Sequence, residues 1–359
     1  MIDPGYFQRV SQQTPTTMWV NNPTREEARL AIEAGALGCT CNPSYCQKMI
    51  DHPEEGTYAR ALLDEAVRES STDGEAEEIL QRKPIKAIAG IFLPTYEKSG
   101  RMHGYVSIQG DPIREGDPNV IIEEAFKNRT LGHNVCIKVP VTASGLSAME
   151  EMIAKGVLIN STEVFGVAQA HSLCETYRRV TKKSGKRPKM YLSHITGIYD
   201  EYLRNYVIEH NVEISQDVLW QAGLAVARKV YQLLVDRRYP VTFVGGGARG
   251  LHHFTEMVGG GVVVTINWAG TAEKLLQDNP PVVYRLFNPV PRHVIAELMR
   301  KLPDFRRGYL NQGLRVEDYE EFGPVEFFRG SFIKSWSRVL DLAKERRKVF
   351  REDLSVGGS

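Results

Sequence analysis

A single lysine, Lys138, interrupts the otherwise apolar run at residues 135–140 (VCIKVP). Successive side chains of a β-strand point to opposite faces, so Cys136 and Lys138 share one face and the aliphatic residues share the other. Neither face is plainly polar, which predicts that Lys138 points into an apolar interior. Burial lowers the pKa of an amine and makes it nucleophilic near neutral pH, as in lysines that form Schiff bases. The alternative is a lysine on an edge strand whose ammonium reaches water.

Strand-like and helix-like segments alternate along most of the chain, which has 359 residues. We expect strands near residues 17, 37, 104, 133, 157, 190, 241 and 261, and helices at 24–34, 120–128, 146–155, 163–181, 216–237 and 251–258. Eight such units over about 250 residues predict an α/β fold, a (β/α)8 TIM barrel. An open doubly wound sheet is the main competitor, but no GxGxxG motif follows the first strand. Residues 85–93 are ambiguous, because they look locally like a strand.

The pattern changes after residue 280, where four prolines fall within twelve residues (Pro280, Pro281, Pro289 and Pro291). Helices are expected near 292–301 and 332–350. We therefore predict a catalytic barrel over residues 1–280 and a C-terminal helical extension over 281–359 that packs on it.

Polar side chains gather where the expected strands end. In a barrel of this type the active site lies at the carboxyl ends of the strands. The candidates there are Asn21, Asn42, Gln109, Lys138, Asn160, Thr162, Ser193, His194 and Arg249. Each also has a simpler explanation: asparagines cap helices, and the three glycines before Ala248 and Arg249 are a turn signal as well as a possible anion nest.

Bulk composition excludes several classes of function. The chain carries 45 Lys+Arg against 44 Asp+Glu, a net charge of +1, which gives no reason to expect binding to nucleic acid or to a membrane. No apolar run reaches transmembrane length and the N-terminus lacks the features of a signal peptide, so we expect a cytoplasmic protein. Zinc binding by Cys39, Cys41, Cys46 and His52 is conceivable, but their spacing favours apolar packing.

Four segments together resemble the transaldolase family of class I Schiff-base aldolases. Residues 38–44 (GCTCNPS) are similar to its G-x-T-x-N-P-S segment, and residues 105–109 (YVSIQ) to its third strand. Residues 135–140 resemble the segment around its Schiff-base lysine, and residues 156–165 (GVLINSTEVF) resemble its Asn-x-Thr stretch. The resemblance covers roughly residues 15–275 and implies that residues 85–93 are helical.

The resemblance also implies a mechanism. Lys138 would form an imine with a sugar-like ketone, possibly phosphorylated, and a retro-aldol step would leave a dihydroxyacetone unit on the lysine for transfer or release. Asn42 and Asn160 would orient the bound hydroxyls and imine, and Thr162 would hold the water used for proton transfer. Ser193 and Arg249 would contact the far end of the substrate. Neither metal nor cofactor is implied, and a homodimer is expected.

The departures from the family are specific. The acid on the first strand falls on Asn21, an amide that cannot exchange protons, and the acid on the third strand falls on Gln109. One phosphate-binding arginine falls on Ile198. His194 and Glu163 are candidates to restore acid–base function, with a loop residue and a helix first-turn acid as the respective alternatives. We therefore expect an atypical substrate; a non-catalytic barrel that binds a sugar or metabolite is the competing hypothesis.

Overall fold

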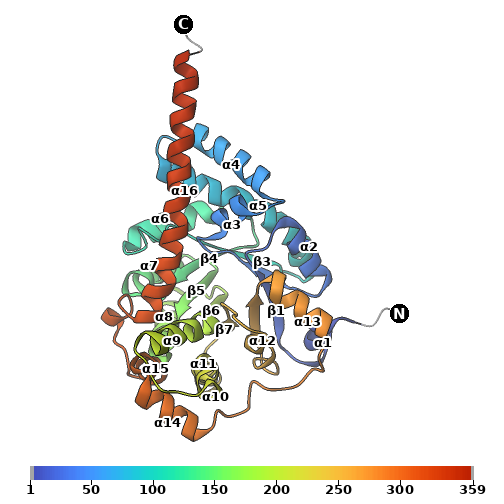
Figure 1. Ribbon diagram of the computed structural model, residues 1–359, viewed down its shortest axis with the longest axis vertical. Helices are drawn as coiled ribbons and strands as arrows, with labels where there is room; N and C mark the ends of the chain where they lie inside the picture. Colours follow the sequence, from blue (N-terminus) through green and yellow to red (C-terminus); the bar gives the residue numbers. More distant parts are fainter. Residues whose placement is uncertain (1–3, 357–359) are drawn as a thin grey trace.

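The computed structural model describes the backbone of residues 4–356 and the side chains of residues 4–352. Eight parallel strands form a closed barrel in which each strand pairs with the next and the last pairs with the first (Figure 1). The predicted (β/α)8 TIM barrel is therefore confirmed. The strands are β1 (Thr17–Asn21), β2 (Gly38–Thr40), β3 (Tyr105–Gln109), β4 (Val135–Pro140), β5 (Ile159–Val164), β6 (Met190–His194), β7 (Thr242–Gly245) and β8 (Val262–Ile266).

Aromatic and aliphatic side chains fill the lower part of the barrel interior. Trp19 and Tyr191 pack with ring centroids 5.0 Å apart, and Cys136 belongs to the same buried cluster. Gly38 makes room for this packing, because a Cβ on it would lie 2.4 Å from the Trp19 ring. This plug leaves the upper part of the interior, at the carboxyl ends of the strands, to polar side chains.

Helices connect the strands and cover the outside of the barrel. The helix after β1 begins as predicted: the Thr24 side chain accepts a hydrogen bond from the Glu27 N–H at 3.0 Å, and the Glu27 carboxylate accepts one from the Thr24 N–H at 2.7 Å. The helices are α1 (Tyr6–Gln13), α2 (Arg25–Glu33), α3 (Tyr45–Asp51), α4 (Gly56–Glu69), α5 (Asp73–Lys98), α6 (Pro118–Arg129), α7 (Ala143–Ala154), α8 (Val167–Ser184), α9 (Thr196–Glu209), α10 (Gln216–Leu219), α11 (Ala222–Asp236), α12 (His252–Thr255), α13 (Glu273–Asp278), α14 (Arg292–Lys301), α15 (Pro303–Tyr309) and α16 (Gly323–Val356).

Residues 85–93 are helical, within α5, as the family resemblance implied. Other helices differ from the prediction. The one expected at 251–258 is only the short α12, His252–Thr255. Residues 163–181 are not one helix, because β5 continues to Val164 before α8 begins. The helix expected at 216–237 is divided into α10 and α11. The Gly223 N–H donates to the Asp200 carboxylate at 2.6 Å instead of to a carbonyl four residues back, so the helix does not run through this point.

The C-terminal helix α16 runs along the longest axis of the molecule, and its end lies beyond the barrel (Figure 1). Near its start it passes the mouth of the barrel, and farther on it packs against α4 and α5, where Arg346 pairs with Asp64 at 2.6 Å. Across the described residues, no helix combines the length and the hydropathy needed to cross a bilayer.

Candidate active site

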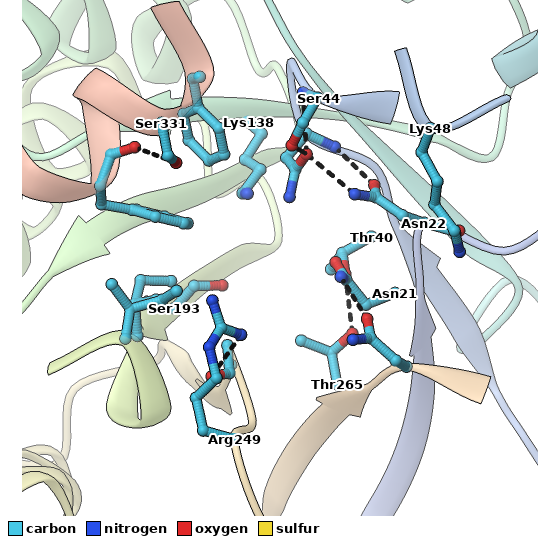
Figure 2. Close-up of a pocket in the computed structure, with 18 of the residues that line it drawn as sticks. Asn21, Asn22, Thr40, Ser44, Lys48, Lys138, Ser193, Arg249, Thr265 and Ser331 are labelled. Atoms are coloured by element: carbon cyan, nitrogen blue, oxygen red, sulfur yellow. Dashed lines mark hydrogen bonds between the residues drawn. The ribbon is translucent and has the colours of Figure 1, made fainter. Parts of the chain in front are cut away.

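A cavity of about 370 Å³ opens at the carboxyl ends of the strands (Figure 2). Five of the ten residues selected from the sequence line it: Asn21, Asn42, Lys138, Ser193 and Arg249. The other five, Gln109, Asn160, Thr162, Glu163 and His194, are almost completely buried behind it. The described residues that line this cavity include no carboxyl or imidazole group. The polar side chains of the lining are amides, hydroxyls and a few cations.

Lys138 lies between this cavity and a second one, of about 20 Å³, on the side of β3. Lys138 is 6% exposed, and this burial lowers the pKa of the amine to about 8. The neighbouring Glu163 acts in the other direction, because its negative charge favours the charged amine and raises the pKa. The Phe332 ring of α16 lies 5.9 Å from the Lys138 Nζ. The amine is thus held in a confined space where a sizeable fraction is uncharged near neutral pH.

Gln109 and Asn160 flank Lys138 directly, since they are its register partners on β3 and β5. The Asn160 Oδ1 accepts a hydrogen bond from the Ser193 Oγ at 2.7 Å, which fixes the orientation of the amide. The Asn160 Nδ2 and the Thr162 Oγ1 are buried and have no partner among the described residues. Buried polar atoms of this kind are costly unless a ligand uses them.

A β-bulge in β5 determines where Glu163 points. Between Ser161 and Val164 the pairing with β6 slips by one residue, and Glu163 takes the left-handed conformation with φ of 58°. Its carboxylate accepts a hydrogen bond from the Gln109 Nε2 at 2.9 Å, on the inner side of the barrel. The alternative, an acid in the first turn of a helix, does not match its position within β5.

A second buried carboxyl, Glu115, belongs to the same cluster and was not found from the sequence. It accepts a hydrogen bond from the Gln109 Nε2 at 3.4 Å and lines the small cavity beside Lys138. Burial and the neighbouring Glu163 raise the pKa of Glu115 well above its ordinary value. Glu115 lies in the loop after β3, and no residue pattern there marks it as different from a surface acid.

The mouth of the cavity holds an uncharged network where Asn21 lies (Figure 2). The Asn21 Nδ2 donates to the Asn267 Oδ1 at 2.9 Å, and its Oδ1 accepts from the Thr40 Oγ1 at the same distance. Thr40 also shares a 2.7 Å hydrogen bond with Thr265. Both ends of the Asn21 amide are therefore engaged, and the side chain orients its neighbours without exchanging a proton.

Asn42 is fixed in the same way on the other side of the mouth. Its Oδ1 accepts hydrogen bonds from the Asn22 Nδ2 at 2.9 Å and from the Ser44 Oγ at 2.7 Å. The Asn42 N–H donates to the Asn22 Oδ1 at 3.0 Å. A rigid amide at the cavity wall is suited to positioning the hydroxyls of a bound ligand.

Arg249 reaches the cavity from the loop after β7, but its charge already has a partner. The Nε lies 2.5 Å from a carboxylate oxygen of Glu201 on α9. Ile198 also lines this part of the cavity. The positive charge available for a phosphate is therefore weaker than that of an unpaired guanidinium.

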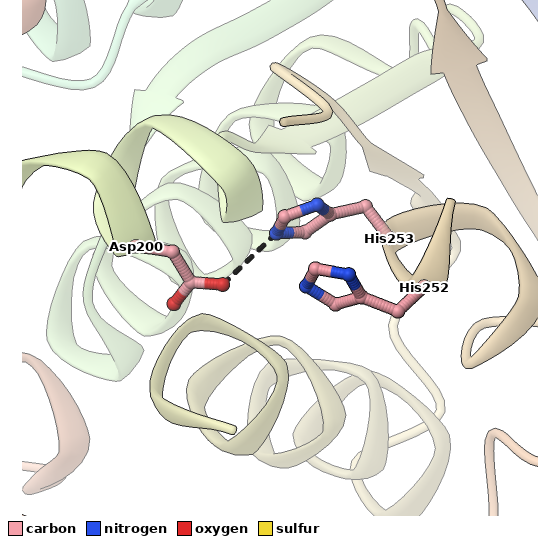
Figure 3. Close-up of side chains that lie close together, drawn as sticks. All are labelled: Asp200, His252 and His253. Atoms are coloured by element: carbon pink, nitrogen blue, oxygen red, sulfur yellow. Dashed lines mark hydrogen bonds and ion pairs between the residues drawn. The ribbon is translucent and has the colours of Figure 1, made fainter. Parts of the chain in front are cut away.

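A buried Asp200–His253 pair holds the Arg249 loop in place (Figure 3). The Arg249 N–H donates to the His253 Nδ1 at 3.2 Å, so the proton of this imidazole sits on Nε2, which lies 2.9 Å from the Asp200 Oδ2. His252 lies close enough to complete a three-ligand group, but both nitrogens of His253 are already engaged. We interpret the group as a structural support of the loop.

Comparison with known proteins agrees with this geometry. A sequence model of the family "Transaldolase/Fructose-6-phosphate aldolase" matches residues 18–302. The chain belongs to this family. It is 26% identical to the transaldolase of Thiobacillus denitrificans over 307 residues, covering 79% of this chain and 80% of that protein.

Two Streptomyces relatives align over a shorter segment. Transaldolase 1 of Streptomyces avermitilis is 32% identical over 179 residues, and transaldolase 1 of Streptomyces coelicolor is 30% identical over 181 residues. In each case the alignment spans 48% of this chain and 46% of the relative, so the chain matches about half the length of these two proteins.

His194, a candidate acid–base residue in this family member, lies outside the cavity. It follows the inward-pointing Ser193 on β6, so its ring points away from the interior and stacks on Phe243 with centroids 6.3 Å apart. Its Nδ1 lies 2.9 Å from the Thr196 Oγ1. Burial lowers the pKa of His194 to about 3, which keeps it uncharged at neutral pH. In this position the imidazole does not face a ligand in the cavity.

Helix α16 contributes aromatic residues that sequence reasoning missed. Phe328, Ser331 and Phe332 line the cavity, and both phenylalanine rings are almost fully buried. They come from a helix about 190 residues after Lys138, and nothing in the local pattern of α16 indicates which of its turns reaches the barrel. The helix thereby closes one side of the mouth and excludes water from the amine.

Two cysteines, one within β2 and one directly after it, pack in the core. The Sγ atoms of Cys39 and Cys41 lie 3.8 Å apart, and both residues are fully buried. Burial raises the pKa of Cys39 well above its ordinary value, so the thiol stays protonated.

Proposed function

We propose that this protein makes or breaks a carbon–carbon bond of a sugar-like carbonyl substrate through an imine on Lys138, by transfer of a dihydroxyacetone unit or by aldol cleavage. The observation that carries the proposal is a buried amine with a pKa lowered to about 8, aimed into a cavity lined by amides and hydroxyls. Membership of the transaldolase/fructose-6-phosphate aldolase family supports it.

The reaction begins with attack of the uncharged Lys138 amine on a ketone, followed by loss of one water and uptake of one proton to give the iminium. The iminium nitrogen accepts the electron pair of the adjacent carbon–carbon bond as that bond breaks, and the hydroxyl proton of the departing fragment is lost to a base. An aldehyde leaves and an enamine stays on the lysine. Addition of the enamine to a second aldehyde gives transfer, whereas protonation and hydrolysis give cleavage.

The residues of the cavity wall indicate which groups of the substrate are recognised. Asn42 and Ser193 supply hydrogen-bonding groups for hydroxyls, as expected for a polyhydroxylated chain. Arg249 marks where the far end of the substrate would lie. Because Arg249 is paired with Glu201 and its neighbour is Ile198, this end of the cavity would bind a phosphate more weakly than two free arginines would. The substrate is therefore a sugar-like ketone whose recognition depends mainly on its hydroxyls.

Reductive trapping tests the covalent step. The protein is incubated with ketoses in phosphorylated and unphosphorylated pairs, treated with borohydride, and analysed by mass spectrometry of its peptides. We expect a stable adduct on Lys138 and none in the Lys138→Met variant. If no member of the panel gives an adduct on Lys138, the proposed mechanism is wrong.

A non-catalytic barrel that binds a sugar or metabolite is the second candidate. The absence of carboxyl groups among the described residues that line the main cavity favours it. Calorimetry with wild-type protein and the Lys138→Ala variant separates the two candidates. Equal affinity of the two proteins for an unmodified sugar, together with no adduct trapped on Lys138 of the wild type, would favour the binding protein.

A further inference from the structure

We propose that Glu163 is the acid–base residue of the reaction at Lys138, held in place by Gln109. This inference rests on the proposed function and deepens it, because it assigns proton transfer to a position on β5 in a chain that carries amides at Asn21 and Gln109. The inference follows from the bulge that turns Glu163 inward, from its hydrogen bond to Gln109 beside Lys138, and from the charged groups around it.

The backbone turns Glu163 inward at a cost. Regular alternation would place Glu163 on the same face as Ser161, whose hydroxyl lies 3.3 Å from the Met149 Sδ outside the barrel. The bulge and the φ of 58° reverse this direction and bring the carboxyl to the inner side. A non-glycine residue in this conformation is strained, and such strain persists where a side chain must be aimed.

The hydrogen bonds leave half of the carboxylate free. Its Oε1 accepts from Gln109, which is the direct register neighbour of Lys138, so the group lies beside the amine. Its Oε2 is buried and has no partner among the described side chains and backbone. The Oγ1 of Thr162, the preceding residue, is unpartnered in the same way. A free, buried carboxylate oxygen next to a nucleophilic amine is what proton transfer requires.

The surrounding charges decide which carboxyl is ionised. Glu163 faces Lys138 on β4, Glu115 in the loop after β3, Gln109 on β3 and Arg329 on α16. Burial raises the pKa of Glu163, while Gln109, Lys138 and Arg329 act against that rise. Two carboxyls that share one amide donor do not both ionise readily. Glu115 makes the longer hydrogen bond and its pKa is raised well above its ordinary value, so we place the negative charge on Glu163.

Glu163 acts first as a base and then as an acid. With the substrate bound as an iminium on Lys138, the Glu163 carboxylate takes the proton of the hydroxyl on the departing carbon. The electron pair of the breaking carbon–carbon bond moves to the iminium nitrogen, and the aldehyde leaves. The neutral Glu163 then returns the proton either to the enamine carbon or to the oxygen of an acceptor aldehyde.

The test compares adduct formation with turnover in Glu163→Gln. We expect the variant to form the borohydride-trapped adduct on Lys138, with multiple-turnover cleavage reduced on the order of 10²-fold or more. Loss of the negative charge should also move the pH midpoint of adduct formation to lower pH, because Glu163 favours the charged amine. Glu163→Asp keeps the charge but shortens the side chain, so turnover should fall at least tenfold with the midpoint unchanged.

Glu77→Gln is the matched control. Glu77 is a buried carboxyl on α5 that lines neither cavity, and burial raises its pKa to about 10, so it is uncharged at neutral pH. We expect full turnover from this variant. Turnover of Glu163→Gln or Glu163→Asp within threefold of wild type would overturn the inference, and so would loss of the adduct in folded Glu163→Gln. Absence of the adduct in the wild-type protein would instead contradict the proposed function itself.

Discussion

Burial destabilises the charged form of the Lys138 amine. This makes the amine reactive near neutral pH, but it also lowers the stability of the folded protein. The rate of imine formation should therefore follow the uncharged fraction and rise with pH through about 8, levelling off above it. Rates of adduct formation with one ketose, trapped at intervals from pH 6 to 10, measure this directly. A midpoint near the ordinary lysine value of about 10.4 would show that the amine is not desolvated.

The same burial predicts how stability changes in Lys138→Met. In the folded protein the amine has a pKa of about 8, lowered from 10.5, so the folded state binds fewer protons than the unfolded state between these values. Stability of the wild type should thus rise as pH increases from 8 to 10.5, and the penalty of the charged amine is largest below pH 8. At about 1.4 kcal/mol per pKa unit, the variant should gain roughly 3 kcal/mol at pH 7 and little at pH 10, as measured by urea unfolding.

His194 provides a pH dependence of the same sign in a lower pH range, located away from the cavity. Its pKa is about 3 in the folded protein and 6.5 when exposed, so the unfolded state binds the extra proton between these values. Stability should therefore fall as pH drops from 6.5 towards 3. The His194→Phe variant should lose this one-proton dependence while keeping its turnover, because the ring stacks on Phe243 and lines no part of the cavity. A large loss of turnover in a folded variant would contradict this placement.

At the scale of elements, helix α16 forms one side of the site, whose other walls come from the strands and the loops that follow them. Phe332 is 1% exposed and its ring lies 5.9 Å from the Lys138 Nζ. In Phe332→Ala, water should reach the amine, so the pH midpoint of adduct formation should rise from about 8 towards the ordinary lysine value. The truncation should also cost about 3–5 kcal/mol of stability. An unchanged midpoint would mean that other residues exclude water from the amine.

The elements themselves follow closely from the sequence, since apolar strands and amphipathic helices have different periods. All eight strands lie where that alternation predicts, and Thr24 caps α2 as its spacing with Glu27 indicates. The local pattern also located Lys138 on an inner face. These features depend on residues close together in the chain.

Features that depend on long-range packing could not be predicted in the same way. The bulge at Glu163 has no sequence signal, because glutamate rarely adopts a left-handed backbone and only the surrounding barrel holds it there. The inward position of Glu115 is set by its hydrogen bond to Gln109. The arrival of Phe328 and Phe332 at the mouth is set by the packing of α16 along the whole barrel.

At the scale of the whole molecule, α16 connects the barrel mouth to the α4–α5 region. Its position depends on charged side chains as well as on apolar packing. Arg346 pairs with Asp64 at 2.6 Å, and Arg338 lies 3.3 Å from Asp51. Movement of this helix relative to α4 and α5 would displace Phe332, so stability and the environment of Lys138 are linked through it.

Arg347 should be the polar residue of α16 that contributes most to this connection. Its side chain is 14% exposed, and its guanidinium donates hydrogen bonds to the Asp73 carboxylate at 2.7 Å, the Ser70 carbonyl at 2.8 Å and the Thr72 carbonyl at 2.9 Å. Arg347→Ala leaves these acceptors without their donor, so we expect a loss of about 2–4 kcal/mol in urea unfolding. Arg338→Ala is the matched control: its side chain is 58% exposed and makes a single ion pair, worth about 0.5 kcal/mol or less. Equal losses in the two variants would show that the α4–α5 loop does not depend on Arg347.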